Sequence, residues 1–296
     1  MKNFTEQRNK ASMNLDQLSI KESLKLMNSQ DKLVPDAVQR TLPEIEKLIE
    51  AIIKCFNNDG RLIYIGAGTS GRLGILDAVE CVPTFGTSPE VVVGLIAGGD
   101  TAIKNAVEGA EDSVVLAKED LKNLSLTKND IVIGISASGR TPYVIGGLNY
   151  AKKIGAKTGS VTNNKNTKIS TIVDYPVEVI TGPEVLTGST RLKAGTAQKI
   201  VLNMVSTISM IKIGKAYENL MVDVQATNEK LVDRSKRIIV EATGVDYEKA
   251  EEIFEEAQTV KIGIVMILAE SSKEEAVKAL NETDGFVREA IQKIKS

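Results

Sequence analysis

Short apolar runs alternate with helix-like segments from residue 61 to about residue 180, and this alternation constrains the fold more than any other feature. The runs are Leu62–Ile65, Val91–Ile96, Ile131–Ile135, Thr158–Val161 and Tyr175–Ile180. Strands that alternate with helices predict a doubly wound parallel sheet with helices on both faces. Because Pro176 has no N–H to donate, the last run is expected at a sheet edge or a strand start.

Helices are predicted on both sides of this region. Ser19 and Glu22 fit a capping box that opens a helix through about Asn28. Pro35 lies near the start of one longer helix, whose apolar positions recur at helical spacing as far as Ile53.

A long apolar helix is predicted over 194–212, and beyond about Asn228 only short helices are expected. The chain therefore divides into an N-terminal helical arm that packs on the sheet domain, the sheet domain itself, and a small C-terminal helical bundle. The predicted boundaries of these three segments are 1–60, 61–225 and 226–296.

The 296-residue chain contains no histidine. This absence excludes Ser-His-Asp and Cys-His catalysis, and it removes the commonest transition-metal ligand. Acid–base chemistry must then come from Glu, Asp, Lys, Tyr or Cys side chains. A reaction without cofactor or metal, run by carboxyl groups, is the expectation.

Charge and cysteine content bear on partners and compartment. The formal net charge is −2, so no basic field exists to bind nucleic acid or an anionic membrane. The first dozen residues lack the apolar core of a signal peptide, and the longest apolar stretch, Val260–Ala269, is too short to cross a bilayer. Two cysteines without a repeated spacing suit a reducing compartment. A cytoplasmic protein is expected.

The first candidate site is the glycine-rich loop Gly66-Ala-Gly-Thr-Ser-Gly-Arg72, which follows a buried apolar run and opens a helix. Such a turn offers unpaired backbone N–H groups, the positive end of a helix dipole and two hydroxyls, all of which bind phosphate. Gly68, Thr69 and Ser70 are the candidate ligands. The pattern is not a Walker loop, because no Gly-Lys-Ser/Thr follows. A tight strand-to-helix turn without a ligand is the alternative.

A second loop, Ser136-Ala-Ser-Gly-Arg-Thr141, follows the third run and precedes Pro142 at a helix start. Ser136, Ser138 and Thr141 supply three hydroxyls, more than a helix cap needs. Ligands of doubly wound sheets bind at the carboxyl ends of the strands, so the two loops are expected to hold one phosphate together. Arg72 and Arg140 are possible helpers, or surface and ion-pair residues.

These two loops resemble those of the sugar isomerase (SIS) domain, a flavodoxin-like fold. Longer motifs are similar to those of the bacterial N-acetylmuramic acid 6-phosphate etherase family, and the resemblance extends over nearly the whole chain. The motifs are Gly66–Gly86, Gly94–Gly99, Ala106–Ser113, Gly182–Lys199 and, near the N-terminus, Leu15–Ser19 with Asp31-Lys32. One departure is Val82, where the family more often has proline.

The resemblance implies a lyase that removes D-lactate from the C3 ether of the sugar and leaves N-acetylglucosamine 6-phosphate. It carries the two functional glutamates of the family onto Glu80 and Glu111, with Glu80 as the acid for lactate departure and Glu111 as the base near C2. A resemblance to the aldose-ketose isomerases of this domain implies sugar contacts around Glu184 and Lys193. Each of these residues has a structural alternative: a solvated helix face for the first two, and a helix entry for the others.

Two other functions remain open. A phosphosugar isomerase shares proton removal at C2 but has no use for Glu80. A sugar-phosphate sensor, similar to glucokinase regulatory protein or to a transcription regulator, needs no catalytic group. The N-terminal helices show no basic face for DNA, and only one such sugar domain is present, whereas the animal regulatory protein has two.

The spacing between the first loop and Glu80 raises a question of assembly. If one helix runs unbroken from Ser70 to Glu80, ten residues of about 1.5 Å rise separate them by about 15 Å. Either this helix ends early or bends, or Glu80 serves the site of a neighbouring subunit. A homodimer with shared active sites is the hypothesis.

Overall fold

The computed structural model describes residues 3–225 and 228–296, and contacts between residues divide the chain into two compact units. The first unit holds the described residues up to Val79 together with Pro89–Ser206, and the second holds Glu80–Ser88 and the described residues from Thr207 onward. The three-part division at residues 60 and 225 stays a prediction.

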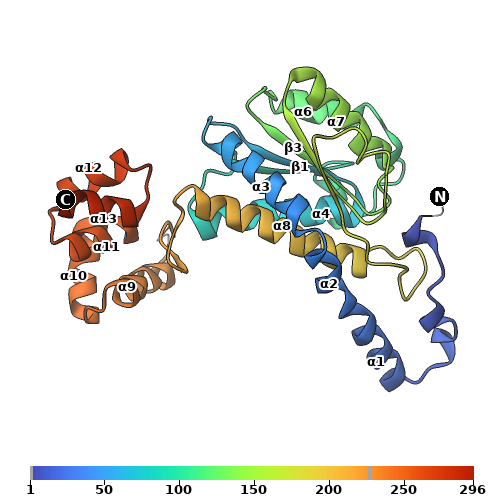
Figure 1. The fold of residues 1–296 in the computed structure, drawn as a ribbon, viewed down its shortest axis with the longest axis horizontal. Coiled ribbons are helices and arrows are strands. Elements are labelled where there is room, and N and C mark those ends of the chain that lie inside the picture. Colours follow the sequence, from blue (N-terminus) through green and yellow to red (C-terminus); the bar gives the residue numbers. More distant parts are fainter. Residues whose placement is uncertain (1–2, 226–227) are drawn as a thin grey trace. The chain divides into compact units, whose positions relative to one another are not determined.

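The first unit contains one sheet of five parallel strands in the order β2-β1-β3-β4-β5 (Figure 1). Every predicted run forms a strand, and the run containing Pro176 forms the edge strand, so both expectations are confirmed. The strands are β1 (Leu62–Gly66), β2 (Val92–Ile96), β3 (Ile131–Ser136), β4 (Lys157–Thr162) and β5 (Tyr175–Glu178).

Helices cover both faces of this sheet, as expected for a doubly wound fold (Figure 1). On one face, the buried side chains of Ile63, Ile65 and Val132 pack with α6 and α7. On the other face, Tyr64 meets α4, and α3 packs against β5. The helices of this region are α1 (Ile20–Asp31), α2 (Leu33–Gln39), α3 (Leu42–Phe56), α4 (Gly68–Phe85), α5 (Thr101–Lys104), α6 (Leu116–Asn123), α7 (Pro142–Ile154) and α8 (Lys193–Lys212).

The N-terminal arm differs from the prediction in one respect. Ser19 and Glu22 form the predicted capping box, and α1 follows it. The single helix expected from about Pro35 is instead two helices, which separate at Arg40 and Thr41. Pro43 explains the break, because its ring nitrogen has no hydrogen with which to continue the ladder of the preceding helix.

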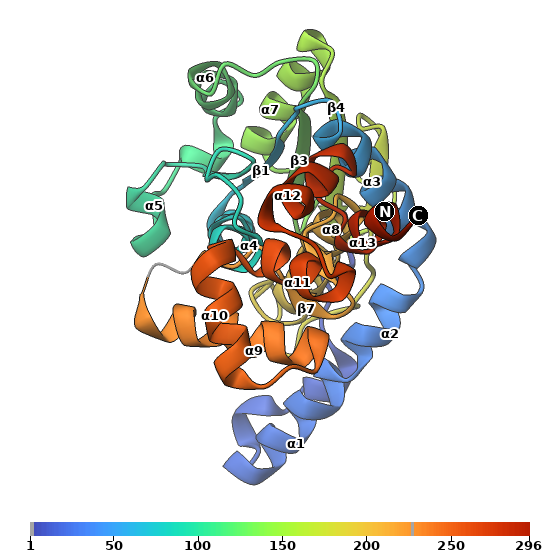
Figure 2. The same cartoon turned by 90° about the vertical axis from the view of Figure 1, so that its left-hand side faces the viewer.

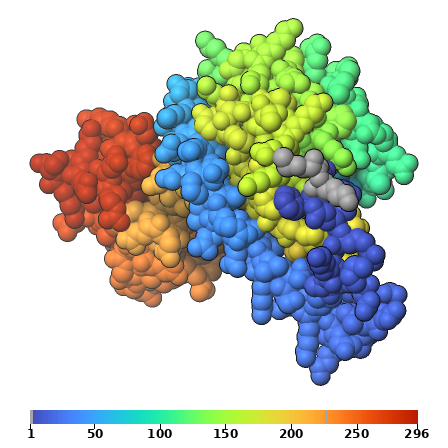
Figure 3. All heavy atoms as spheres, turned by 45° about the vertical axis from the view of Figure 1, so that its right-hand side comes forward, coloured from blue at the N-terminus to red at the C-terminus, as the bar shows by residue number. Residues whose placement is uncertain are grey.

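Helix α1 contains no buried residue. Its apolar side chains Ile20 and Leu24 are 82% and 64% exposed and lie one helical turn apart. Figure 3 shows the surface of α1, in dark blue, protruding from the rest of its unit. Short 3-10 turns precede it at Phe4–Glu6, Lys10–Ser12 and Leu15–Gln17, and a further one lies at Ala110–Asp112.

The second unit is mainly a helical bundle around a separate apolar core that includes Ile239, Ile264 and Val265 (Figure 2). A short hairpin, β6 (Ala216–Tyr217) and β7 (Leu220–Met221), precedes the helices. They are α9 (Glu229–Thr243), α10 (Tyr247–Ala257), α11 (Val260–Ala269), α12 (Lys273–Glu282) and α13 (Val287–Lys295). Across 3–225 and 228–296, no helix has both the length and the apolar character needed to cross a bilayer.

A buried carboxyl group lies between the sheet and its helices. Asp77 of α4 is 8% exposed and accepts hydrogen bonds from Tyr64 Oη (2.9 Å) and Ser206 Oγ (3.0 Å). Burial raises the pKa of Asp77 to about 6, although the two hydroxyl donors and the charge of Lys199 favour ionisation. Because the folded chain holds this proton more tightly than the unfolded chain, folding stability falls as pH rises from about 4 to about 6.

We predict that Asp77→Asn raises the free energy of unfolding near neutral pH. The difference between a pKa of about 6 and the ordinary 3.8 corresponds to at most about 3 kcal/mol. An amide keeps partners for both hydroxyls and carries no charge. Urea unfolding should show the gain above about pH 6 and little difference near pH 4.

Asp130→Asn is the matched control. Burial alone raises the pKa of Asp130, but hydrogen bonds from Arg61 and Thr127 outweigh burial and hold that pKa below its usual value. The stability from this carboxylate is present at neutral pH and is lost in acid, so its removal should destabilise the chain at neutral pH. A loss of stability in both variants near pH 7 would contradict the account of Asp77.

Candidate functional site

The two predicted loops lie side by side because β1 and β3 are paired neighbours. The two strands end within one residue of the same register, since Gly66, the last residue of β1, pairs with Ile135, the residue before the end of β3. From β1 the sheet continues to β2 on one side, and from β3 to β4 on the other, so the order of strands reverses between the two loops. In sheets of this order, such a switch point opens a crevice at the carboxyl ends of the strands, where ligands bind.

The first loop forms the N-terminus of α4. Gly68 has a φ of +54°, a left-handed conformation that favours glycine. The N–H of Gly71 donates to the Ala67 carbonyl at 3.2 Å, which is the first bond of the helical ladder. The N–H groups of Gly68, Thr69 and Ser70 precede that bond and are the unsatisfied donors of a helix start. This geometry suits an anion.

The second loop gathers its three predicted hydroxyls. Ser136 Oγ lies 2.8 Å from Thr141 Oγ1 and 3.4 Å from Ser138 Oγ, and it accepts the N–H of Gly139 at 3.1 Å. Gly139 itself has a φ of +67°. Arg140 is exposed and extends from the same turn. The structure therefore brings Ser136, Ser138 and Thr141 together as one polar cluster.

Glu111 lies in a cavity with the first loop. The cavity has a volume of about 200 Å³, and Gly68, Arg72, Glu108 and Glu111 are among its lining residues. Glu111 belongs to the 3-10 turn Ala110–Asp112, which follows a left-handed Gly109. One carboxyl group predicted for catalysis thus opens onto the same space as one residue predicted for phosphate binding.

Arg72 makes hydrogen bonds to backbone carbonyls, a role that the sequence did not indicate. Its guanidinium donates to the carbonyls of Ala102 (2.8 Å), Ile103 (2.8 Å) and Asn105 (3.2 Å) at the end of α5. These bonds tie the helix of the first loop to the segment that leads to Glu111.

The hydroxyl of Ser70 is directed into the protein. Ser70 is 8% exposed, and its Oγ donates to Oε1 of Gln198 at 2.9 Å. Gln198, on α8, was not predicted as a functional residue. The sequence did contain a signal for it. Gln198 is a polar residue four positions from Ala194 and from Leu202, so it lies on the buried face of the helix.

Glu184 is fully buried, and its two oxygens accept the N–H groups of Lys193 (3.0 Å) and Ala194 (2.9 Å) at the start of α8. Burial raises the pKa of Glu184 and lowers that of Lys193. The Nζ of Lys193, itself 1% exposed, donates to Gln30 Oε1 at 3.2 Å. These contacts give Glu184 a helix-capping role, and sugar binding by Glu184 stays a prediction.

Glu80 belongs to the second unit and is exposed. Helix α4 continues through it to Phe85, with Pro83 inside the helix. The helix therefore does not end before Glu80, which removes one explanation of its distance from Ser70.

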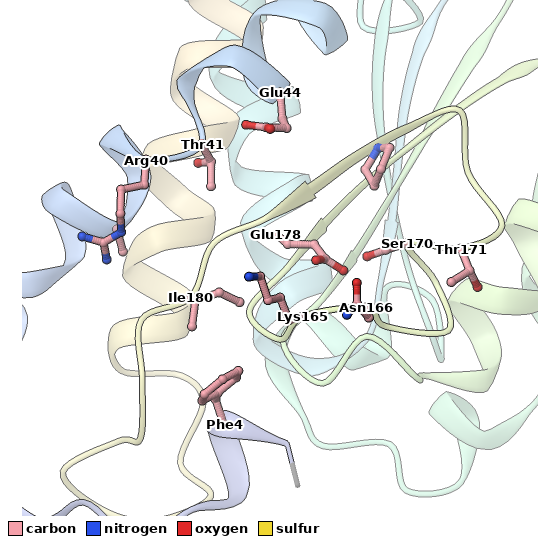
Figure 4. A pocket seen from close by; sticks show the side chains of 12 residues that line it. Phe4, Arg40, Thr41, Glu44, Lys165, Asn166, Ser170, Thr171, Glu178 and Ile180 are labelled. Atoms are coloured by element: carbon pink, nitrogen blue, oxygen red, sulfur yellow. The ribbon is translucent and has the colours of Figure 1, made fainter. Parts of the chain in front are cut away.

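A larger cavity of about 680 Å³ lies elsewhere in the first unit, beside β5 (Figure 4). In Figure 4, the side chains of Glu178 and Ser170 point toward one another inside it. Its lining contains none of the predicted site residues. Size alone therefore does not mark the candidate site. Within 3–225 and 228–296, no group of three or more Cys, Asp or Glu side chains is arranged to hold a metal ion.

Comparisons with known proteins bear on this site. Two family models match: the glucokinase regulatory protein N-terminal SIS domain over residues 44–152, and the SIS domain over residues 112–208. The N-acetylmuramic acid 6-phosphate etherase of Exiguobacterium sp. is 63% identical over 97% of this chain and 98% of that protein. N-acetylmuramic acid 6-phosphate etherase 2 of Enterococcus faecalis is 62% identical over 97% of both.

Solved structures are similar in fold. Phosphoheptose isomerases from Neisseria gonorrhoeae and Francisella tularensis each superimpose with a TM-score of 0.50. They are 15% and 16% identical and cover 64% and 66% of this chain, which is 98% and 99% of their own length. This likeness confirms the expected SIS-type fold.

We predict that Arg72→Gln loosens the segment 101–112. Removing a guanidinium that holds three carbonyls should speed amide hydrogen exchange there by about tenfold or more, since hydrogen bonds to charged groups contribute about 1.5–3 kcal/mol each. Mass spectrometry of peptides from 101–112 measures the effect.

Arg61→Gln is the control, because Arg61 holds another loop in the same way. Its guanidinium donates to the carbonyls of Leu124 (2.9 Å) and Ser125 (3.3 Å) and pairs with Asp130 at 2.8 Å. This variant should accelerate exchange around 124–130 and leave 101–112 unchanged. Unaltered exchange of 101–112 in Arg72→Gln would refute the tethering role.

Proposed function

We infer that this chain, which belongs to the N-acetylmuramic acid 6-phosphate etherase family, cleaves the lactyl ether of N-acetylmuramic acid 6-phosphate. Relatives of that name match it at 62–63% identity over 97% of its length. The enzyme is a carbon–oxygen lyase. We propose that its products are N-acetylglucosamine 6-phosphate and D-lactate, and that it works in the cytoplasm in cell-wall amino sugar recycling or catabolism.

The observation that carries the proposal is the common location of an anion site and a carboxyl group. The unsatisfied N–H groups at Gly68–Ser70 and the hydroxyl cluster of Ser136, Ser138 and Thr141 offer donors to a sugar phosphate at the switch point of the sheet. Glu111 opens onto the cavity that Gly68 also lines. A phosphosugar anchored there has a base within the same space.

Elimination requires two carboxyl groups in opposite protonation states. Opening of the sugar ring exposes an aldehyde that acidifies the C2 proton. In our proposal, the Glu111 carboxylate removes this proton, and the electron pair forms the C2–C3 double bond as the C3–O bond to lactate breaks. Glu80 gives its proton to the departing oxygen. Water then adds to C3, and a proton returns to C2. The proton removed from C2 and the proton given to lactate both move through carboxyl groups, so these two steps require no cofactor or metal.

Incubation with N-acetylmuramic acid 6-phosphate in deuterated water tests this scheme. We expect the wild-type chain to release lactate and to place deuterium at C2 of the product, as measured by mass spectrometry. Glu111→Gln should lose both, because no base remains. Glu80→Gln should lose lactate release by at least about a hundredfold, as expected for a general acid, and should still exchange the C2 proton. Absence of lactate from the wild-type reaction would overturn the function.

We also propose a homodimer in which Glu80 completes the site of the neighbouring subunit. The unbroken course of α4 supports it, because about ten residues of helix separate Glu80 from Ser70, or about 15 Å.

A mixture of Glu80→Ala and Ser138→Ala chains distinguishes shared from separate sites. If the subunits share sites, a heterodimer keeps one intact site, and the re-associated mixture should recover about a quarter of wild-type activity by random pairing of chains. At substrate concentrations well below the wild-type KM, Glu80→Ala alone should be nearly inactive, and Ser138→Ala alone should keep about a tenth of wild-type activity or less. A mixture that forms heterodimers without recovering activity would contradict sharing.

A further inference from the structure

A buried series of hydrogen bonds connects the two loops through α8 and the residue that directly follows β4. Ser70 Oγ donates to Gln198 Oε1 at 2.9 Å, and Gln198 Nε2 donates to Asn163 Oδ1 at 3.0 Å. Asn163 Nδ2 donates to the Val179 carbonyl at 3.0 Å, and its backbone N–H donates to the Ala137 carbonyl of the second loop at 3.1 Å. The Ser70, Gln198 and Asn163 residues are only 8%, 1% and 0% exposed.

The donor and acceptor in each hydrogen bond of this series follow from its last acceptor, the carbonyl of Val179. The carbonyl of Val179 only accepts, so the amide nitrogen of Asn163 must face it, and the amide oxygen of Asn163 faces Gln198. Gln198 therefore presents its nitrogen to Asn163 and its oxygen to Ser70. A serine hydroxyl has a single hydrogen, and here that hydrogen is directed to Gln198.

We propose that Gln198 is a positioning residue that fixes the Ser70 proton inward and holds the two phosphate loops at one separation. Ser70 then contributes its backbone N–H to the phosphate, and its hydroxyl presents only lone pairs to a ligand. Lone pairs suit a hydroxyl of the sugar and repel a phosphate oxygen. In this arrangement, the side-chain donors to the phosphate come from the second loop.

The proposal deepens the assigned function, on which it rests for the identity of the phosphosugar. The claim about phosphate binding depends only on the two loops and not on the identity of the sugar. Two probes separate the two parts: inorganic phosphate, which has no sugar hydroxyl, and N-acetylglucosamine 6-phosphate, the proposed sugar product. Affinity of the full chain for each is measured by calorimetry, and the melting temperature of each variant is measured alongside.

Serine variants of the two loops test the direction of the Ser70 proton. Ser70→Ala keeps the backbone N–H that faces the phosphate and the Gln198–Asn163 bond, so it should raise the Kd for inorganic phosphate by no more than about twofold. It should lower the melting temperature, because Gln198 Oε1 loses its buried donor. Ser138→Ala should raise the same Kd by about tenfold or more, as expected when a hydrogen bond to a charged group is lost. A tenfold loss of phosphate affinity in Ser70→Ala would overturn the proposed direction.

Gln198→Glu tests the positioning role through its pH dependence. Near pH 8 the introduced carboxylate has no hydrogen for Asn163, so the Kd for the phosphosugar should rise by about fivefold or more relative to wild type. Near pH 5.5 the buried carboxyl group takes up a proton, which restores the glutamine pattern, and the ratio should return to within about twofold.

Ser206→Ala is the matched control, because Ser206 lies on the same helix and donates one buried hydrogen bond, to Asp77. It should lower the melting temperature without changing phosphosugar affinity at either pH.

A Gln198→Glu chain with a lower melting temperature but wild-type affinity near pH 8 would show a merely structural role and overturn the proposal. Wild-type chain that binds neither probe would overturn the phosphate site itself. Normal binding without lactate release would contradict the etherase function and leave this inference standing.

Discussion

The reversal of strand order between β1 and β3 is the constraint on which the candidate site depends. Because β2 and β4 lie on opposite sides of this pair, the connections after β1 and β3 leave the sheet in opposite directions. Both connections begin at the carboxyl end of a strand, and ligands of such sheets bind at this reversal of strand order. Each loop has hydroxyl groups and precedes the N-terminus of a helix. Together at one switch point they offer more hydrogen-bond donors to an anion than either loop alone.

Helix α8 connects this crevice to the interior of the first unit. Its first turn is capped by the buried Glu184, its next turn carries Gln198, and Ser206 binds Asp77 near the boundary of the unit. Buried polar groups are expensive unless every donor and acceptor is paired. The amide of Gln198 and the carboxyl groups of Glu184 and Asp77 are buried in this unit, and each is hydrogen-bonded. The bonds of Gln198 also hold the loops in place.

The strands and the first helix start could be predicted from the sequence, whereas one helix break and the role of Arg72 could not. The strands β1 and β3 are buried along their whole length, so each leaves a nearly continuous apolar run, and all five runs that the sequence predicts form strands. The capping box at Ser19 is a local signal and was also found. The break at Thr41 was missed, because the apolar spacing continues across it and only Pro43 marks it. The part played by Arg72 depends on carbonyls about 30 residues away in the chain, which no local pattern records.

Ser70 shows where motif reasoning reaches its limit. A hydroxyl in a glycine-rich loop at a helix N-terminus has the chemistry to bind phosphate, and residue type and spacing establish that much. Whether the hydroxyl donates a hydrogen bond to the ligand or only accepts one depends on where its single hydrogen points. That hydrogen is directed by a glutamine 128 positions later in the chain. The glutamine is directed in turn by an asparagine and a backbone carbonyl that directly follow the strands β4 and β5. A motif therefore identifies the groups that meet a ligand, whereas the tertiary network beneath them decides which groups donate and which accept.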